Sequence, residues 1–306
     1  MKDIRRRVLT AFALNRTPGL HFPGNFLGVT FAETTAERSR VGLQAGEFCA
    51  ELDGQAHPGV IALLADIALA SVVRANLTPA QRLATVSLQL QFTGAPSTGP
   101  LEACGEFTGF LYGAAGQQGL SRSTMSANGQ TVLLGSGAFM VLNPPPGVTM
   151  HVPVSADHAT ASPLRESELT RVERSILKRV DAALADPSQA RSFLQRFWGL
   201  DPQPSAQGAV CVVDNDLHLG NRVGFMQGGL QVGIAINTAN AALPTNWKVS
   251  GITACFISPG AGRVLRATSR VIHRGGQTAV VRTVITGKNR QRVLEATSTH
   301  VRRGGE

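Results

Sequence analysis

The stretch HPGVIALLADIAL, residues 57–69, places a single carboxylate inside an otherwise apolar run. The run extends over residues 59–75, which is the length of a helix rather than of a strand. A helix that is apolar almost all round must be buried on most of its sides. Asp66 is then either the one exposed position of this helix or a carboxylate that works at an interface.

Runs with strand character lie on both sides of this helix. The clearest is VSLQLQF, residues 86–92, in which apolar and polar side chains alternate. A two-residue period is typical of a half-buried antiparallel strand. Further strand candidates cover residues 40–52, 101–113, 119–126 and 131–142. The first half of the chain is therefore expected to form an antiparallel sheet with one long buried helix, an α+β arrangement.

The same order of elements recurs in the second half. GGLQVGIAINTANAAL, residues 228–243, is a second long apolar run, and strand candidates precede and follow it. His57 aligns with Gln227 at an offset of 227 − 57 = 170 residues, and FTGAP (92–96) aligns with FISPG (256–260) at 256 − 92 = 164. The elements follow in the same order in both halves, and the offset changes because the loops differ in length. We interpret the chain as a tandem duplication with a period far beyond that of solenoid repeats.

Proline-rich sequence separates the two halves. NPPPG, residues 143–147, cannot continue a central strand because proline has no backbone N–H. We predict a first domain over residues 1–145, a linker over residues 146–165, and a second domain over residues 166–306.

Two helical patterns open the predicted second domain, whereas the first domain opens with one predicted helix over residues 2–14. The first pattern is expected to begin with Ser167 as N-cap and to end at Asp186, because Pro187 follows. The second is PSQARSFLQRFW, residues 187–198.

Composition and charge exclude several classes of function. The net charge is +9, but the basic residues are scattered and no basic block is interleaved with aromatic residues, so no nucleic-acid partner is expected. A small anionic ligand or a solvated basic surface accounts for the charge equally well. The four cysteines stand singly, which gives zinc ribbons no support, and no metal site is predicted.

No targeting or membrane-spanning segment is expected. The chain contains no run of about 18 apolar residues, the length that a membrane span requires. The N-terminal MKDIRRRVLTAFALN has the pattern of an amphipathic helix rather than of a signal peptide. We therefore predict a cytoplasmic protein without a membrane partner.

The two apolar segments resemble a known family. HPGVIALLADIAL followed by TVSLQLQF resembles the hotdog-fold acyl-CoA thioesterases of the PaaI-like (4-hydroxybenzoyl-CoA thioesterase-related) superfamily, whose central helix opens with H-G-G-x(6)-D. NRVGFMQGG resembles the family's N-x-x-G-x-x-H-G-G segment, with Gln227 at the histidine position. The resemblance covers residues 30–142 and 205–302. It implies two tandem hotdog domains, each an antiparallel sheet wrapped around a long helix, that pair as an intramolecular pseudo-dimer.

The resemblance also implies how the two halves share one site. Family members use a helix carboxylate of one unit and a backbone N–H of the facing unit. The first half keeps Asp66, but Pro58 at its donor position has no N–H. The second half has Gly228 as donor, but Ile236 replaces the aspartate. We expect one composite active site, in which Asp66 is nucleophile or general base and the Gly228 N–H holds the oxyanion.

Further site residues follow from the resemblance. Asn221 stands at the family's asparagine position, where the first half has Glu51, and Asn221 and Gln227 are expected to position water or the carboxylate. Gly229 and His57 are assigned to substrate binding. The sequence leaves other interpretations open, because Asn221 also suits a turn and Gln227 suits a buried amide bonded to the backbone.

Three more substrate-binding candidates lie on strands and hairpins. Thr85 and Ser87 begin the strand after the first apolar helix, and the sequence does not fix which hydroxyl points inward, because a one-residue slip reverses the faces. Arg274 lies in HRGGQT, residues 273–278, which resembles the hairpin whose basic residue contacts coenzyme A phosphates. A solvated arginine in a turn explains Arg274 equally well.

The resemblance implies an acyl-CoA thioesterase that acts on a small-molecule acyl-CoA, needs no cofactor beyond the coenzyme A of the substrate, and forms homo-oligomers. The altered motifs leave a non-catalytic acyl-CoA-binding protein as the alternative. A hydratase or dehydratase ranks third, because it needs a histidine and an acid in one site and His57 is its candidate. HFPGN, residues 21–25, resembles a segment of hydroxyacyl-ACP dehydratases, but the helix begins too far downstream, and His21 is predicted to be a loop residue.

Overall fold

The computed structural model describes residues 2–113, 116–144, 161–186 and 190–303. Within this part of the chain, twelve strands form one antiparallel sheet. They are β1 (Thr30–Thr34), β2 (Arg38–Gln44), β3 (Arg82–Phe92), β4 (Pro100–Gly113), β5 (Gly116–Ala127), β6 (Gln130–Leu142), β7 (Gln203–Ser205), β8 (Gly208–Asp214), β9 (Trp247–Phe256), β10 (Val264–Arg274), β11 (Thr278–Thr286) and β12 (Arg292–Arg302). Their order in the sheet is β1-β2-β4-β5-β6-β3-β9-β12-β11-β10-β8-β7.

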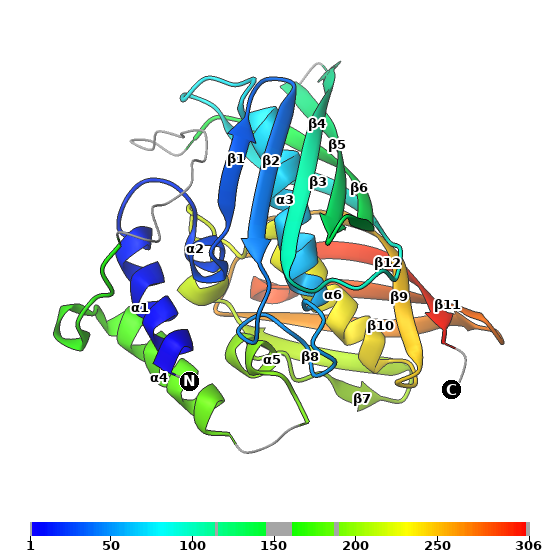
Figure 1. Ribbon diagram of the computed structural model, residues 1–306. Helices are drawn as coiled ribbons and strands as arrows, with labels where there is room; N and C mark the ends of the chain where they lie inside the picture. Colours follow the sequence, from blue (N-terminus) through cyan, green and yellow to red (C-terminus); the bar gives the residue numbers. More distant parts are fainter. Residues whose placement is uncertain (1, 114–115, 145–160, 187–189, 304–306) are drawn as a thin grey trace.

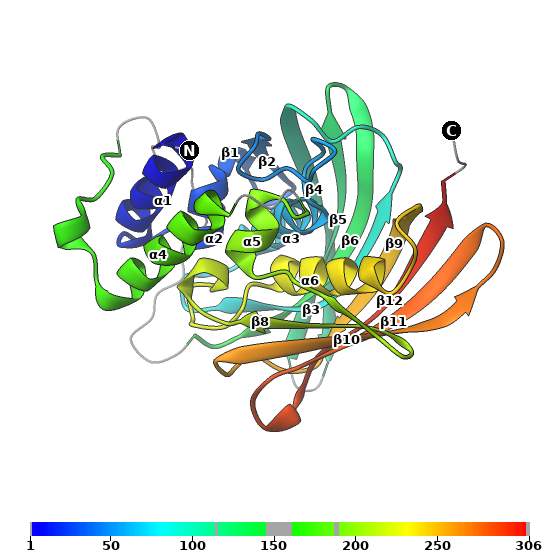
Figure 2. The same ribbon diagram turned by 90° about the horizontal axis from the view of Figure 1, so that it is seen from below.

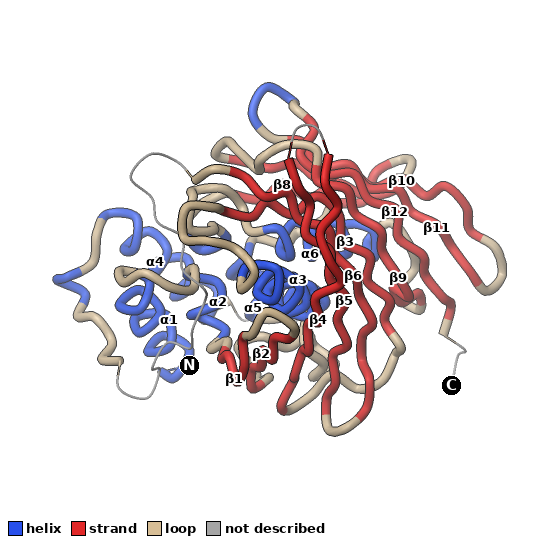
Figure 3. The backbone as a smooth tube through the Cα atoms, turned by 90° about the horizontal axis from the view of Figure 1, so that it is seen from above, coloured by secondary structure: helices blue, strands red, loops and turns tan. Residues whose placement is uncertain are grey.

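Two long helices, α3 (Pro58–Arg74) and α6 (Gly228–Ala241), lie side by side on the concave face of this sheet (Figures 1 and 2). The other helices are α1 (Lys2–Asn15), α2 (Phe22–Leu27), α4 (Arg171–Ala185) and α5 (Phe193–Trp198), with short 3₁₀ turns η1 (Glu166–Glu168), η2 (Leu217–Leu219) and η3 (Lys288–Arg290). Helices α1, α2 and α4 gather at one side of the molecule, away from most of the strands, whereas α5 lies beside α3 (Figure 3). The predicted arrangement of sheet and central helices is confirmed.

The two halves of the sheet are related by an internal two-fold axis. The strands β3 and β9 pair at its centre and place Gln89 opposite Thr253. These residues are duplicates of each other, because 253 − 89 = 164, the offset at which FTGAP aligns with FISPG. A residue that pairs with its own duplicate lies beside the symmetry axis. The duplication therefore folds as a pseudo-dimer with one continuous sheet.

The backbones of α3 and α6 touch where the helices cross. A Cβ atom on Gly229 would lie 2.5 Å from Leu63 Cα, and one on Gly233 would lie 2.5 Å from Gly59 Cα. Glycine permits this approach because it has no side chain. The crossing brings the N-terminus of α6 beside the middle of α3, where Asp66 lies.

Helix α5 of the second unit has a counterpart in the first unit, α2, which was not predicted. The segments of α2 and α5, FPGNFLG (22–28) and FLQRFWG (193–199), both end at a glycine with a φ of 71°. Phe26 and Phe197 pack edge to face with ring centroids 5.3 Å apart. His21 lies before the helix, as predicted for a loop residue, and it is the N-cap of α2, since its Nδ1 accepts a hydrogen bond from the Gly24 N–H.

Helix α4 begins later than predicted. Thr170 is the N-cap, because its hydroxyl accepts from the Glu173 N–H at 3.2 Å and the Glu173 carboxylate accepts from the Thr170 N–H at 2.7 Å. This reciprocal pair is a capping box, and Ser167 lies in η1 before it. The predicted end at Asp186 is confirmed. Within the predicted helix over residues 187–198, only α5 is helical in the described residues.

The predicted domain boundary and most of the predicted linker, residues 146–165, fall on residues 145–160, which lie outside the described part of the chain. The domain limits therefore stay a prediction. None of the helices in the described ranges combines the length and apolar character that crossing a membrane requires.

Candidate active site

A cavity of about 450 Å³ lies where the N-terminus of α6 meets the middle of α3. The first unit contributes α3, the start of β3 and the end of β6 to its walls. The second unit contributes the loop before α6 and residues 256–260. Asp66, Gln227 and Gly228, which are distant in the sequence, all line this cavity. The resemblance to hotdog-fold thioesterases implies this meeting.

Asp66 accepts three hydrogen bonds and forms no ion pair with any described residue. Its Oδ2 accepts from Gln227 Nε2 at 2.7 Å and from the Gly229 N–H at 3.0 Å. Its Oδ1 accepts from Thr85 Oγ1 at 3.2 Å. Two of these donors belong to the second unit, and they lie at the N-terminus of α6, where the helix dipole stabilises negative charge.

The environment of Asp66 sets its proton affinity. Burial raises the pKa of Asp66 to about 6, and the hydrogen bonds from Gly229, Gln227 and Thr85 limit that rise because they stabilise the ionised form. The carboxylate is therefore ionised at neutral pH and still basic enough to accept a proton. This combination suits a general base.

Gln227 connects the start of α6 to Asp66. Its Oε1 accepts from the Leu230 N–H at 2.9 Å, which caps the helix, while its Nε2 donates to Asp66. His57, the duplicate of Gln227, caps α3 in the same way through Nδ1, which accepts from the Gly59 N–H at 3.0 Å. A glutamine at position 227 therefore provides an acceptor that caps α6 and, at the same time, a donor to the Asp66 carboxylate.

Gly228 presents a free backbone donor beside the carboxylate. Its N–H has no hydrogen-bond partner among the described residues, as is usual in the first turn of a helix. A Cβ atom at this position would lie 3.1 Å from Asp66 Oδ2 and 3.2 Å from Thr85 Oγ1. Glycine therefore leaves the space next to these two groups open.

Gly229 and Asn221 differ from their predicted roles. Gly229 was assigned to substrate binding. Its N–H, the second amide of α6, instead donates to the Asp66 carboxylate. The Asn221 Oδ1 accepts from the N–H groups of Val223 and Phe225, both at 3.0 Å. Asn221 lines the cavity, and these bonds favour the interpretation as a turn residue.

The structure distinguishes the two candidate hydroxyls on β3. Thr85 donates to Asp66, whereas Ser87 faces Cys255 across the β3–β9 pairing and does not line the cavity. A β-bulge between Thr85 and Ser87 shifts the register with β6, so the two positions are not equivalent. The structure therefore brings Thr85, and not Ser87, to the candidate site.

His57 and Arg274 also lie outside the cavity, contrary to the assignments made from sequence. His57 is only 1% exposed and its ring is enclosed. Arg274 is at the far end of β10, which begins shortly after Gly260 of the cavity wall. A strand of 11 residues spans about 30 Å, so the Arg274 side chain does not reach this cavity within one chain.

The duplicate half-site around Ile236 and Pro58 is filled. Trp198 of α5 packs against His57 with ring centroids 5.8 Å apart, and its Cζ3 is 3.1 Å from where a Gly59 Cβ would lie. Trp198 is 2% exposed and Ile236 is fully buried. This half-site has no carboxylate at the aspartate position and no N–H at residue 58.

One part of the cavity wall was not predicted at all. Arg222 donates to the carbonyls of Asn15, Thr17, Gly19 and Leu20 at distances of 2.5–3.0 Å. These bonds hold the turn between α1 and α2 against the cavity, and His21 at the end of this turn lines it. Burial lowers the pKa of His21 to about 3. No local pattern signals a contact between residues about 200 positions apart.

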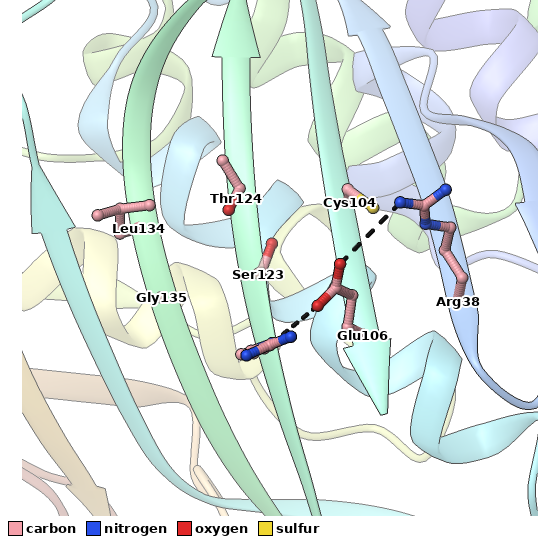
Figure 4. Close-up of a pocket in the computed structure, with 8 residues that line it drawn as sticks. Arg38, Cys104, Glu106, Ser123, Thr124, Leu134 and Gly135 are labelled. Carbon is pink, nitrogen blue, oxygen red and sulfur yellow. Dashed lines mark hydrogen bonds and ion pairs between the residues drawn. The ribbon is translucent and has the colours of Figure 1, made fainter. Parts of the chain in front are cut away.

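A second hollow lies on β2, β4, β5 and β6 (Figure 4). There Glu106 is 2.7 Å from Arg122 and 4.0 Å from Arg38. These pairs are on the face of the sheet that points away from α3, because the neighbouring Ser121 donates to Leu69 of α3. Among the described residues, no group of three or more His, Cys, Asp or Glu could hold a metal ion.

Comparison with known proteins supports the architecture. No family model and no curated protein matches the chain. The 12:0-ACP thioesterase of Umbellularia californica is similar over 87% of this chain and 94% of its own, with 9% identity and a TM-score of 0.56. A conserved hotdog-fold protein of unknown function from Alicyclobacillus acidocaldarius is similar over 91% and 96%, with 10% identity and a TM-score of 0.54.

The tesB protein of Mycobacterium avium subspecies paratuberculosis is similar over 90% of this chain and 96% of its own, with 13% identity and a TM-score of 0.52. The fold is the double hotdog. The predicted pair of tandem hotdog units is thereby confirmed, because these similarities cover both units. Membership of the PaaI-like superfamily stays a prediction.

Proposed function

We propose that this double-hotdog protein is a thioester hydrolase that converts an acyl-CoA and water to a free acid and coenzyme A. The observation that carries the proposal is the position of the Asp66 carboxylate. It lies in a cavity between the units, beside a free N–H at Gly228 and in hydrogen-bond contact with Gln227 and Thr85. The fold shared with a 12:0-ACP thioesterase supports the same class of reaction.

The arrangement suits hydrolysis with Asp66 as general base. Asp66 takes a proton from a water molecule, and the hydroxide formed attacks the thioester carbonyl carbon. The Gly228 N–H donates to the oxygen that becomes negative, backed by the α6 dipole. The tetrahedral intermediate then breaks its C–S bond, and the coenzyme A thiolate receives the proton from Asp66. Gln227 and Thr85 keep the carboxylate oriented throughout.

A hydratase is the second candidate, because His21 lines the same cavity as Asp66. His57, the residue predicted for this role from the sequence, lies in the filled half-site. The His21 Nδ1 accepts the Gly24 N–H, so its proton is on Nε2 at neutral pH. With Nδ1 already engaged, the ring can only donate a hydrogen bond to a substrate. A hydratase also needs a group that accepts a proton, and in this cavity that group would have to be Asp66.

The test is an assay of the purified chain with straight-chain acyl-CoAs, acyl-ACPs and crotonyl-CoA. We expect release of free thiol from saturated thioesters, a loss of at least a hundredfold in Asp66→Asn, and no change in Asp53→Asn, an exposed aspartate outside the cavity. Equal rates for wild type and Asp66→Asn would exclude the mechanism. Binding of the thioesters without turnover would favour the non-catalytic alternative, and hydration of crotonyl-CoA without thiol release would favour the hydratase.

We also propose, from the family resemblance, that the chains associate into homo-oligomers. Light scattering of the purified protein tests this expectation, and a mass equal to one chain at assay concentration would contradict it.

A further inference from the structure

A buried arginine lies in the same cavity as Asp66. Arg74, the last residue of α3, is 5% exposed and lines the cavity. Its Nη1 donates to the Gln81 carbonyl and its Nη2 to the Thr78 carbonyl. Its Nε has no hydrogen-bond partner. The guanidinium therefore keeps an unused donor in a buried position.

No carboxylate offsets this charge among the described residues. Arg74 forms no ion pair there, and burial lowers its pKa. Asp66 is the one acidic residue among those that line the cavity, and its own partners are Gln227, Gly229 and Thr85. A buried cation without an anionic partner is costly, and the two carbonyls supply only partial compensation.

The wall between Asp66 and Arg74 is formed by one face of α3. Ile67, Ala70 and Ser71 lie on it, at the three- and four-residue spacing of a helix. Eight residues at 1.5 Å each place the Asp66 and Arg74 Cα atoms about 12 Å apart. Leu83 of β3 also lines the cavity, so the path from the catalytic carboxylate to the guanidinium is mainly apolar.

We propose that this path binds the acyl group of the substrate and that Arg74 binds an anionic group at its far end. The preferred substrates are then thioesters of dicarboxylic acids, with the thioester carbonyl at Gly228 and the free carboxylate at Arg74. Arg82, which lines the same cavity and begins β3, adds positive charge near this end. The inference rests on the thioesterase activity proposed above and adds the substrate class.

A phosphate of coenzyme A would offer Arg74 the same chemistry. The burial of Arg74 and the apolar wall favour the acyl carboxylate, because a nucleotide phosphate is bulky and strongly hydrated. The two sources are separated by thioesters of N-acetylcysteamine, which lack the nucleotide and its phosphates.

The experiment compares matched pairs of substrates, such as adipyl-CoA with hexanoyl-CoA and suberyl-CoA with octanoyl-CoA. We expect wild type to favour the carboxylated member of at least one pair in kcat/KM. In Arg74→Gln this preference should fall roughly tenfold, the loss typical of one charge-assisted hydrogen bond. Arg122→Gln is the matched control, because Arg122 is 74% exposed on the outer face of the sheet, and it should keep the wild-type preference.

The N-acetylcysteamine arm uses the same acyl pairs. An effect of Arg74→Gln that persists in this arm assigns Arg74 to the acyl carboxylate. An effect seen only with coenzyme A thioesters, equal for both members of each pair, assigns Arg74 to a phosphate and overturns the substrate class. If the wild-type protein prefers the uncarboxylated thioester of the pair at every acyl length, the proposed substrate class is also overturned. This outcome needs no variant.

Binding separates this inference from the proposed reaction. Isothermal titration of S-(carboxyalkyl)-CoA and S-alkyl-CoA thioethers, which cannot be hydrolysed, reports the site even in a chain without turnover. Tighter binding of the carboxylated thioether by wild type, lost in Arg74→Gln, supports the inference although hydrolysis fails. Hydrolysis with equal binding of both thioethers supports the reaction and excludes the role of Arg74.

Discussion

The Asp66 carboxylate is held by three donors and by no cation, so its charge depends on pH near the physiological range. Burial raises its pKa to about 6, and only the ionised form can accept a proton from water. We expect kcat/KM for thioester hydrolysis to be level above pH 7 and to fall tenfold per pH unit below about pH 6. A rate that stays level down to pH 5 would contradict the general-base role.

The same shift predicts that Asp66 destabilises the fold at neutral pH. Because the pKa is higher in the folded than in the unfolded chain, the stability contributed by this group is full at low pH and is lost as the pH rises through about 6. Asp66→Asn keeps the shape and does not ionise. We expect it to be inactive yet more stable than wild type by about 3 kcal/mol at pH 8, with the difference vanishing near pH 4.

Denaturant unfolding at both pH values measures this difference. A variant that is less stable than wild type at pH 8 would show that the hydrogen bonds of the carboxylate outweigh its desolvation. Asp53→Asn, at an exposed position, is the control for the change of charge alone.

Gln227 is predicted to position Asp66 and to hold its pKa down. Gln227→Leu removes the 2.7 Å donor, so we expect kcat to fall about tenfold to a hundredfold and the acid limb of the pH profile to move to higher pH. Gln227→His, which can cap and donate like the amide, is expected to restore part of the rate. An acid limb that stays in place in Gln227→Leu contradicts this role.

At the scale of residues, the group around Asp66 was predicted from the sequence. The resemblance to hotdog-fold thioesterases implied that Asp66 meets Gln227 and Gly228, and the alignment of the two apolar helices showed which half keeps which group. The structure directs the Gly229 N–H at Asp66 and leaves Ser87, His57 and Arg274 outside the cavity, because hydrogen-bond direction, a β-bulge and packing decide which group points into it. Arg74 was not found, because its role depends on the absence of a nearby acid, which no local pattern records.

At the scale of elements, the crossing of α3 and α6 positions the site. Gly229 and Gly233 let the helix backbones touch, and this contact sets the distance between Asp66 and the first amides of α6. The periodicity of the sequence predicted both helices and the main strands. It did not predict α2, because a helix of six residues is too short to show a period.

Gly233→Ala tests this crossing. The new Cβ would lie 2.5 Å from the Gly59 Cα, and backbone cannot move aside as a side chain can. We expect a loss of about 1–3 kcal/mol in the free energy of unfolding and a lower kcat, measured by denaturant titration and thioester assay. Gly276→Ala, where a Cβ would meet nothing within 4 Å, is the control. Equal losses in both variants would argue against the crossing as the cause.

At the scale of the whole molecule, the two duplicated half-sites differ in the described residues. The composite half-site has Asp66 and a free N–H at Gly228, whereas the other has Ile236, Pro58 and a buried Trp198. We expect titration with a non-hydrolysable acyl-CoA thioether to give one ligand per chain. Two ligands per chain would show that the half-site behind Trp198 opens.

The sequence by itself determined a duplicated α+β chain with one long apolar helix in each half, because hydrophobic periodicity and an internal repeat are properties of the chain alone. Its resemblance to hotdog-fold thioesterases implied the double hotdog and the pairing of Asp66 with the start of the second apolar helix. The tertiary structure decided which amide serves the carboxylate, that Trp198 closes the duplicate half-site, and that Arg74 is buried without an acid. These features arise from contacts between side chains far apart in sequence, where packing, burial and hydrogen-bond geometry act together.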